Sequence, residues 1–263
     1  MKVALDLSKR GTGFTEPNPL VGAVVVKDHR LIASGYHARF GGPHAEPMAL
    51  EKVDTADTTL YVTLEPCTHY GKTPPCTDII LKKKVKRVVV AMKDPNPLVD
   101  GKGIRILEKQ GIKVEVGLLQ PMAQKINRHY ITFMTQKRPY ITLKAGVSLD
   151  GKLTDKYRKS QWVTGETLRR FSHSLRGEFS AVLVGVQTVI DDDPQLTLRE
   201  SGWEDKKMYR VVPDSGNRLD PRLKIFKHQE RFPLILFSSK KAPDQNPKVE
   251  HHFFIYPDET GRG

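Results

Sequence analysis

Both cysteines of this 263-residue chain lie in one short proline-rich segment, EPCTHYGKTPPC, at residues 65–76. The segment is too rich in proline and glycine to be helix or strand throughout. It follows directly after TLYVT (59–63), whose β-branched and aromatic residues predict a strand. The fold therefore has to end a strand at a structured loop that carries two thiols.

Three side chains in and near this segment have the chemistry of zinc ligands, namely His44, Cys67 and Cys76. We expect each of them at the start of a helix, where the helix dipole lowers a thiol pKa and favours the thiolate. One imidazole and two thiolates suit Zn²⁺ and leave a fourth tetrahedral position open, as in catalytic sites. The sequence therefore predicts one zinc ion per chain.

Glu46 lies two residues after His44, in the triplet His-Ala-Glu. Beside zinc, a carboxylate that is not a ligand can carry a proton from water to a leaving nitrogen. The sequence H-x-E followed by P-C and a second cysteine is the signature of zinc deaminases. Simpler interpretations exist for each residue alone, because a histidine before a helix is commonly a cap and buried thiols behave as small apolar groups. The conjunction of the motifs favours the deaminase. We expect His69 to contact the substrate or to form a hydrogen bond within its own loop, since a spacing of two residues from Cys67 is unfavourable for binding the same metal ion.

Strands and helices alternate along the chain, which predicts an α/β fold. In the first part a hairpin at 21–35 precedes strands at 59–63, 85–91 and 112–116 and helices at 44–52, 77–84 and 102–110. The segment TQKRPY resembles a linker. We expect one domain at 1–138 and a second at 139–263, which begins with a strand at 140–145.

The composition predicts a cytoplasmic protein with reduced thiols and no membrane span. The longest apolar runs are strand-sized, far below the roughly 20 residues of a membrane helix, and the N-terminus has no secretory signal pattern. The net charge of +13 is compatible with a phosphorylated small molecule or with nucleic acid. The densest basic cluster, at 82–87, is more simply the end of a helix, where cations are favoured, so we expect no nucleic-acid partner.

The first domain resembles the deaminase half of the bifunctional riboflavin-biosynthesis deaminase/reductase in four stretches: PNPLVGAVVV (17–26), PHAE (43–46), YVTLEPCTHYGKTPPC (61–76) and RVVVAMKDPNPLVDGKG (87–103). The resemblance implies a cytidine-deaminase-like three-layer α/β/α domain. It implies zinc ligands at His44, Cys67 and Cys76 and a proton carrier at Glu46. Asn18 matches a position that lines the pyrimidine pocket. The implied substrate is 2,5-diamino-6-ribosylamino-4(3H)-pyrimidinone 5′-phosphate, a small phosphoribosyl pyrimidine.

The second domain is similar to the NADPH-dependent reductase half of the same family, which has a dihydrofolate-reductase-like α/β fold. The similar stretches are LKAGVSLDGKL (143–153), SQWVTGE (160–166), the long stretch at 175–199 and VVPDSGNRLDP (211–221). The positions that match NADPH-binding residues are Gly146, Trp162, Thr188, Asp192 and Ser215. Those that match substrate-binding residues are Ser160, Arg176, Leu196 and Arg199. The two arginines suit a ribosyl phosphate, because a guanidinium binds phosphate oxygens in pairs.

The resemblance also implies that the second domain is incomplete, since the family's reductase domain continues for roughly another hundred residues, within the usual range of domain size. We therefore expect a functional deaminase and a doubtful reductase. An unfinished sheet leaves an edge for a second copy to cover, which favours a homo-oligomer. Pro213 falls inside the stretch YRVVPD (209–214), where a strand is expected, and a proline there would suit only an edge strand. Two alternatives stay open: a nucleoside or nucleic-acid cytidine/adenosine deaminase, and a catalytically impaired regulatory homologue.

Overall fold

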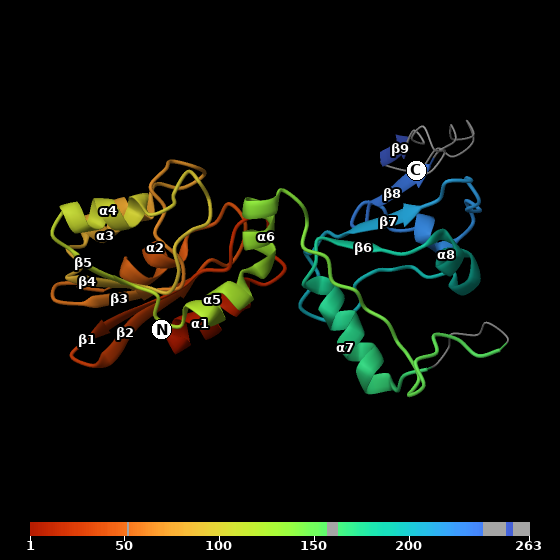
Figure 1. Cartoon of the computed structure of the whole chain (residues 1–263), viewed down its shortest axis with the longest axis horizontal. Coiled ribbons are helices and arrows are strands. Elements are labelled where there is room, and N and C mark those ends of the chain that lie inside the picture. Colours follow the sequence, from red (N-terminus) through yellow and green to blue (C-terminus); the bar gives the residue numbers. More distant parts are fainter. Residues whose placement is uncertain (52, 157–162, 239–250, 255–263) are drawn as a thin grey trace. The chain divides into compact units, whose positions relative to one another are not determined.

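The computed structural model describes residues 1–51, 53–156, 163–238 and 251–254. The chain divides into two compact units, residues 1–142 and 143–263 (Figure 1). No helix among the described residues has both the length and the apolar character that crossing a membrane requires.

The first unit is built on a five-stranded mixed sheet with the order β2-β1-β3-β4-β5. The strand β1 pairs antiparallel with β2 and β3, whereas β3, β4 and β5 are parallel. This confirms the expected hairpin followed by a parallel series. The elements are α1 (Lys2–Ser8), η1 (Lys9–Gly11), β1 (Gly22–Lys27), β2 (Arg30–Tyr36), α2 (Ala45–Leu50), β3 (Thr59–Val62), α3 (Cys76–Lys82), β4 (Arg87–Val90), α4 (Lys102–Lys109), β5 (Lys113–Val116), α5 (Gln120–Ile126) and α6 (Arg128–Gln136).

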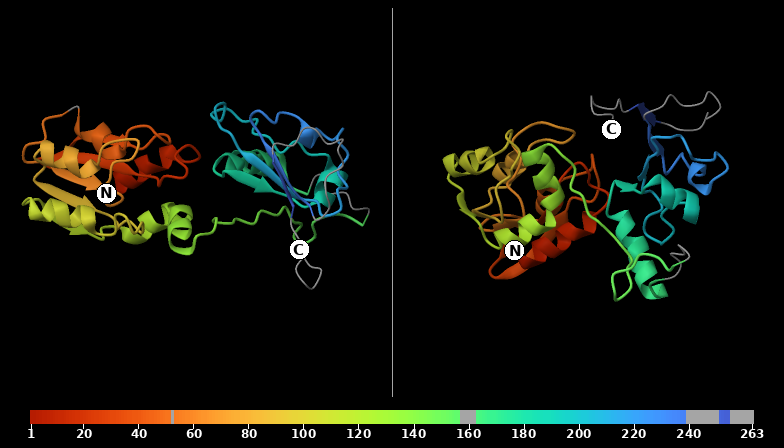
Figure 2. Two further views of the ribbon diagram at one scale, coloured as in Figure 1. Left: turned by 90° about the horizontal axis from the view of Figure 1, so that it is seen from above. Right: turned by 45° about the vertical axis from the view of Figure 1, so that its right-hand side comes forward.

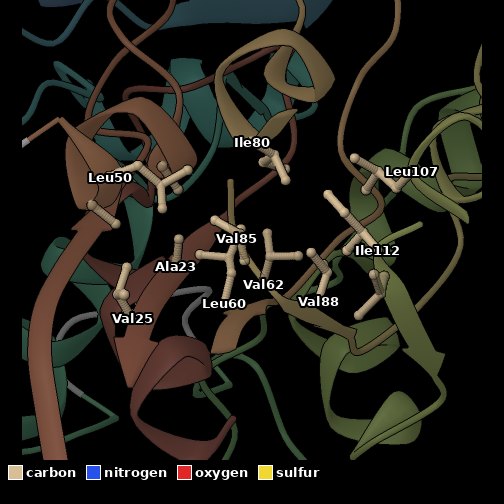
Figure 3. Packing of buried hydrophobic residues seen from close by; sticks show 13 residues of the cluster. Ala23, Val25, Leu50, Leu60, Val62, Ile80, Val85, Val88, Leu107 and Ile112 are labelled. Atoms are coloured by element: carbon tan, nitrogen blue, oxygen red, sulfur yellow. The ribbon is translucent and has the colours of Figure 1, made fainter. Parts of the chain in front are cut away.

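Helices cover both faces of this sheet, as expected for a three-layer domain. On one face α2, α3 and α4 pack their apolar residues against the strands, and Leu60, Val88 and Leu107 are fully buried there (Figure 3). On the other face α1, α5 and α6 contribute Leu5, Ala123 and Tyr130 to a second cluster. With both faces covered, the central strands are apolar on both sides. That explains runs such as VVVA rather than an alternating pattern.

The basic cluster at 82–87 has structural uses in this unit. The ammonium group of Lys83 donates to the carbonyls of Glu51 and Val53 at the end of α2, at 3.2 and 3.4 Å. Lys86 forms an exposed ion pair with Asp57 at 3.0 Å. Cations at a helix C-terminus are favoured by the helix dipole, so these contacts agree with the simpler interpretation of the cluster.

The second unit contains a parallel sheet with the order β6-β7-β8-β9 among the described residues. Its strands lie side by side in the left view of Figure 2. Its core includes Val189, Val212, Ile225 and Leu234. The elements are α7 (Glu166–Gly177), β6 (Ala181–Leu183), α8 (Val186–Asp192), β7 (Tyr209–Pro213), η2 (Lys224–Phe226), β8 (Leu234–Ser238) and β9 (His251–Phe254).

Two expectations for the second unit are wrong. Residues 140–145 form no strand, and the side chains of Ile141 and Leu143 are 75% and 93% exposed. Their alternating pattern suits a strand, but a strand also needs a neighbour to pair with. Pro213 lies in β7, which is an internal strand of the described sheet. It is tolerated because it is the last residue of β7, and the pairing with β6 ends earlier, at Leu183 and Val211.

Candidate active site

The three expected metal ligands are brought together by two helix starts and one loop. His44 is the N-cap residue of α2, and Cys76 is the first residue of α3. Cys67 is not at a helix start, contrary to expectation, because it lies in the loop that follows β3. The loop is nevertheless tied to α3, since the backbone N–H groups of Cys76 and Thr77 donate to the Sγ and the carbonyl oxygen of Cys67.

The ligand atoms have the spacing that a tetrahedral zinc site requires. Nδ1 of His44 is 3.2 Å from Sγ of Cys76 and 3.5 Å from Sγ of Cys67. The three ligand atoms all lie within 4.8 Å of one another. Zinc bonds of 2.0–2.3 Å in tetrahedral geometry place ligand atoms about 3.5 Å apart. One imidazole and two thiols at this spacing fit Zn²⁺ and leave one coordination position for a small ligand.

The two thiols have opposite pKa shifts. A hydrogen bond from the Cys76 thiol lowers the pKa of Cys67, and the neighbouring His44 lowers it further. The same hydrogen bond, together with burial, raises the pKa of Cys76. Without metal the pair therefore shares a proton, which a bound zinc ion displaces, because zinc ligands must be deprotonated.

Glu46 lies in the first turn of α2, and its side chain is only 3% exposed. Burial raises the pKa of its carboxyl group to about 7, and the negative charge of Cys67 contributes to the shift. A group that titrates near neutral pH can both accept and donate a proton under working conditions. Glu46 also lines the pocket beside the metal site.

The metal site opens into a cavity of about 380 Å³ in the first unit. Two residues named from the sequence, Asn18 and His69, line it, and His69 is not among the grouped ligands. The cavity is also lined by residues to which sequence reasoning had assigned no role: His37, Phe40, Lys72, Asp94, Asn96 and Tyr130. The run DPNP at 94–97 was a visible signal for two of them, because it lies within the stretch at 87–103 that resembles the deaminase family.

His37 orients Asn18. Nδ1 of His37 is 2.9 Å from the carbonyl oxygen of Pro43, and Nε2 is 3.2 Å from Nδ2 of Asn18. A carbonyl can only accept, so Nδ1 carries the ring proton and Nε2 accepts from the amide of Asn18. Burial lowers the pKa of His37, which favours this neutral form. The amide oxygen is therefore the group that Asn18 offers to a ligand.

Asp94 forms a polar part of the cavity wall together with Tyr130. Its Oδ1 accepts from the hydroxyl of Tyr130 and from the backbone N–H of Asn96, both at 2.9 Å. Burial raises the pKa of Asp94, and burial likewise raises that of Tyr130. The wall thus presents a carboxyl group whose position is set by two hydrogen bonds.

In the second unit, two residues named from the sequence, Thr188 and Ser215, lie just beyond the carboxyl ends of neighbouring strands, and a third, Asp192, is the last residue of α8. Thr188 and Asp192 are on α8, which follows β6, and Ser215 follows β7. Because β6 and β7 are parallel neighbours, these ends adjoin, and ligands of open α/β sheets bind at such ends. Gly146 lies in the irregular segment before α7. Ser160 and Trp162 fall outside the described residues.

The two arginines named as phosphate-binding residues lie near each other. The guanidinium of Arg176, near the end of α7, donates to the carbonyl oxygen of Thr197 at 2.9 Å. Burial lowers its pKa, and the positive charge of Arg199 adds to the shift. Leu196 is buried, with a φ of 51°. This region therefore places two cations close together next to a tightly turned segment.

Comparisons with known proteins match both units. A family model described as the cytidine and deoxycytidylate deaminase zinc-binding region matches residues 1–92, and the RibD C-terminal domain matches residues 139–259. The riboflavin biosynthesis protein RibD of Aquifex aeolicus is 48% identical over 254 residues, which cover 95% of this chain and 69% of that protein. The corresponding protein of Bacillus amyloliquefaciens is 48% identical over 201 residues, which cover 76% of this chain and 54% of that protein.

A solved structure is similar across both units. The crystal structure of a diaminohydroxyphosphoribosylaminopyrimidine deaminase/5-amino-6-(5-phosphoribosylamino)uracil reductase from Thermotoga maritima superimposes with a TM-score of 0.90 at 42% identity. The match covers 99% of this chain and 74% of that one. The chain therefore spans between about half and three quarters of the length of these relatives.

Proposed function

This chain belongs to the family of the riboflavin biosynthesis protein RibD, and we propose that its first unit is a zinc-dependent deaminase. The proposed substrate is 2,5-diamino-6-ribosylamino-4(3H)-pyrimidinone 5′-phosphate. The observation that carries the proposal is the grouping of His44, Cys67 and Cys76 beside the buried carboxyl group of Glu46 at one cavity.

The reaction exchanges an amino group on the pyrimidine ring for an oxygen from water, and ammonia leaves. When bound, zinc supplies the Lewis-acid activation that makes water nucleophilic at neutral pH. Glu46 takes the proton from water and delivers it to the departing nitrogen, a double task that suits a carboxyl group with a pKa of about 7. Its burial also keeps bulk water from competing for the transferred proton.

The remaining wall of the cavity suits a phosphorylated pyrimidine. Asn18, oriented by His37, offers an acceptor to a ring N–H or amino group. The ammonium group of Lys72 lies 4.0 Å from the centre of the Phe40 ring and lines the same cavity. A cation at that place gives a phosphate an electrostatic partner. Nucleoside and nucleic-acid deaminases are not favoured, since the relatives that match most of the chain are riboflavin biosynthesis proteins.

For the second unit we propose NADPH-dependent reduction of the ribosyl side chain. Thr188 and Ser215, at adjoining strand ends, would hold the cofactor together with Gly146, Trp162 and Asp192. NADPH would supply a hydride. Arg176 and Arg199 would bind the substrate phosphate, and Ser160 and Leu196 would complete that site. An assay of NADPH oxidation with the deaminated pyrimidine as substrate tests this step.

We also propose that the protein works in the cytoplasm, as a homo-oligomer without a nucleic-acid partner. Cys67 and Cys76 are free thiols, and a thiol pair of this kind persists in a reducing compartment. Light scattering after size-exclusion chromatography would measure the oligomeric state, and a single-chain mass would contradict the proposal. Retention on single-stranded DNA at physiological salt would contradict the absence of a nucleic-acid partner.

The deaminase proposal is tested by measuring zinc content and ammonia release on the same preparation. The substrates compared are the diaminopyrimidine phosphate, cytidine and single-stranded DNA. We expect one zinc ion per chain and ammonia release from the diaminopyrimidine phosphate alone. Zinc without turnover on any of the three would instead support a regulatory homologue, and turnover only on cytidine or DNA would replace the proposed substrate.

A further inference from the structure

We propose that Glu65 is a positioning residue of the active site, whose carboxylate holds residues 94–104 so that Asp94 and Asn96 line the cavity. The proposal rests on the deaminase function proposed above for its kinetic consequence, although the contact itself can be tested without it. Glu65 belongs to the motif EPC, and neither the zinc site nor the proton transfer uses it. Its side chain is 3% exposed.

The carboxylate of Glu65 accepts four backbone hydrogen bonds. Oε2 accepts from the N–H groups of Asp94 and Gly101, at 3.2 and 2.9 Å. Oε1 accepts from those of Gly103 and Ile104, at 3.0 and 3.3 Å. The described residues show no ion pair of Glu65 with a lysine or arginine. A buried carboxylate normally needs such a cation, and here four N–H donors stabilise the charge instead.

Two of these donors belong to the first turn of α4. The first N–H groups of a helix have no partner within the helix, and α4 has neither a side-chain cap at Gly101 nor an acidic residue in its first turn. Glu65 therefore caps α4 from a distant part of the sequence, and its charge lies at the favourable end of the helix dipole.

Two glycines allow the start of α4 to lie close to the segment that carries Glu65. Gly101 has a φ of 78°, in the left-handed region. A Cβ atom on Gly103 would lie 2.2 Å from the carbonyl oxygen of Pro66, which is too close for any other residue. The sequence DGKG at 100–103 is thus fitted to the segment that carries Glu65 and the zinc ligand Cys67.

The segment 65–67 therefore connects two parts of the active site, namely the zinc ligands and the part of the cavity wall that Asp94 and Asn96 form. Cys67 follows Glu65 by two residues, and the N–H of Glu65 donates to the carbonyl of Met92 at 3.0 Å. Glu65 then binds the N–H of Asp94, whose side chain in turn binds Asn96 and Tyr130. If the carboxylate were lost, the zinc ligands would stay in place while Asp94 and Asn96 would lose an anchor.

Glu65→Gln tests this arrangement with little change in shape. An amide has one acceptor oxygen and one donor nitrogen, so either orientation of the side chain leaves two of the four backbone N–H groups facing another donor. The matched control is Glu108→Gln, which removes an exposed carboxylate from the same helix, α4. Both variants lose one negative charge, but only the first removes the contact.

Three measurements on the purified zinc-loaded full chain are compared with the wild type. For Glu65→Gln we expect unchanged zinc content, faster amide hydrogen exchange at Asp94, Gly101, Gly103 and Ile104, and a fall in kcat/KM for ammonia release. Displacement of a positioning group commonly costs about 10- to 100-fold. We expect most of the loss in KM, because Asp94 and Asn96 line the cavity proposed for the substrate and take no part in the proposed proton transfer. Glu108→Gln should match the wild type in all three.

Several results would overturn the proposal. Kinetic constants within twofold of the wild type, despite faster exchange, would reduce Glu65 to a residue of structural stability alone. Loss of zinc would mean that it acts on the metal site instead. If Glu65→Gln does not fold, exchange in the wild type decides, since unprotected amides at 94, 101, 103 and 104 would show that the contact is absent. Absence of ammonia release by the wild type would refute the proposed function while leaving the exchange result interpretable.

Discussion

The hydroxyl of Thr73 is expected to strengthen zinc binding through His44. Nδ1 of His44 faces the two thiols, and its Nε2 lies 3.3 Å from Oγ1 of Thr73. When Nδ1 binds metal, Nε2 carries the ring proton and donates it to the hydroxyl. Such hydrogen bonds fix the orientation of a ligating histidine and increase its basicity.

Thr73→Val removes the hydroxyl and keeps the shape of the side chain. The variant leaves a partly buried N–H without its acceptor, at a cost of about 1–3 kcal/mol. At 1.4 kcal/mol per factor of ten, this corresponds to a loss of about 5- to 140-fold in zinc affinity. Thr73→Ser retains the hydroxyl and should bind zinc nearly as tightly as the wild type.

The assay is competition between the metal-free protein and a chromophoric chelator at fixed pH. Cobalt substitution supplies a second measurement, because its visible bands respond to distortion of the ligand geometry. A zinc affinity of Thr73→Val within threefold of the wild type would refute the reasoning. So would an equal loss in Thr73→Ser, which would show that the position, and not the hydroxyl, matters.

Three further predictions follow from the site and the core. Glu46→Gln should lower kcat for ammonia release by at least about 10² to 10⁴ while zinc content stays unchanged, and retained turnover would disprove its role as proton carrier. Apparent zinc affinity should rise with pH, by about one decade per unit near neutrality, because the pKa of Cys76 is raised and its thiol loses a proton on binding; a flat profile in chelator competition would contradict this. Leu60→Ala should destabilise the first unit by about 2–5 kcal/mol in urea unfolding, since Leu60 is fully buried, whereas Leu31→Ala, at a residue 50% exposed, should change the stability little.

The zinc ligands could be predicted from the sequence because the sequence gives the chemistry of these side chains and their spacing along the chain. His44, Glu46, Cys67 and Cys76 are residue types with few alternative uses in that combination, and each follows a strand or turn signal. The alternation of apolar strands with helices likewise predicted the layered fold, since a parallel series of strands needs connecting helices. These inferences depend on local patterns, which a single sequence contains.

The residues that complete the cavity could not be predicted in the same way. His37 acquires its tautomer from the carbonyl of Pro43, and Asn18 acquires its orientation from His37. Asp94 becomes part of the wall because Tyr130, far along the chain, donates to it. Each of these depends on atoms that are distant in sequence, so no local pattern indicates them.

Strand pairing was the second feature that the sequence alone could not predict. Residues 140–145 have the alternating composition of a strand but have no partner among the described residues, and Pro213 is tolerated inside the sheet only because the pairing with β6 has already ended. The β-propensity of a segment indicates that it can form a strand, whereas the presence of a neighbouring strand to pair with determines whether it does.

The sequence alone indicated the zinc ligands, a candidate proton carrier and most of the order of strands and helices, because these depend on side-chain identity and on short-range periodicity. The contacts of Glu65, by contrast, exist only in the folded chain. In the sequence it is a glutamate before a Pro-Cys pair. In the fold its carboxylate accepts hydrogen bonds from four backbone N–H groups of residues 94–104. This role requires residues that are distant from Glu65 in the sequence.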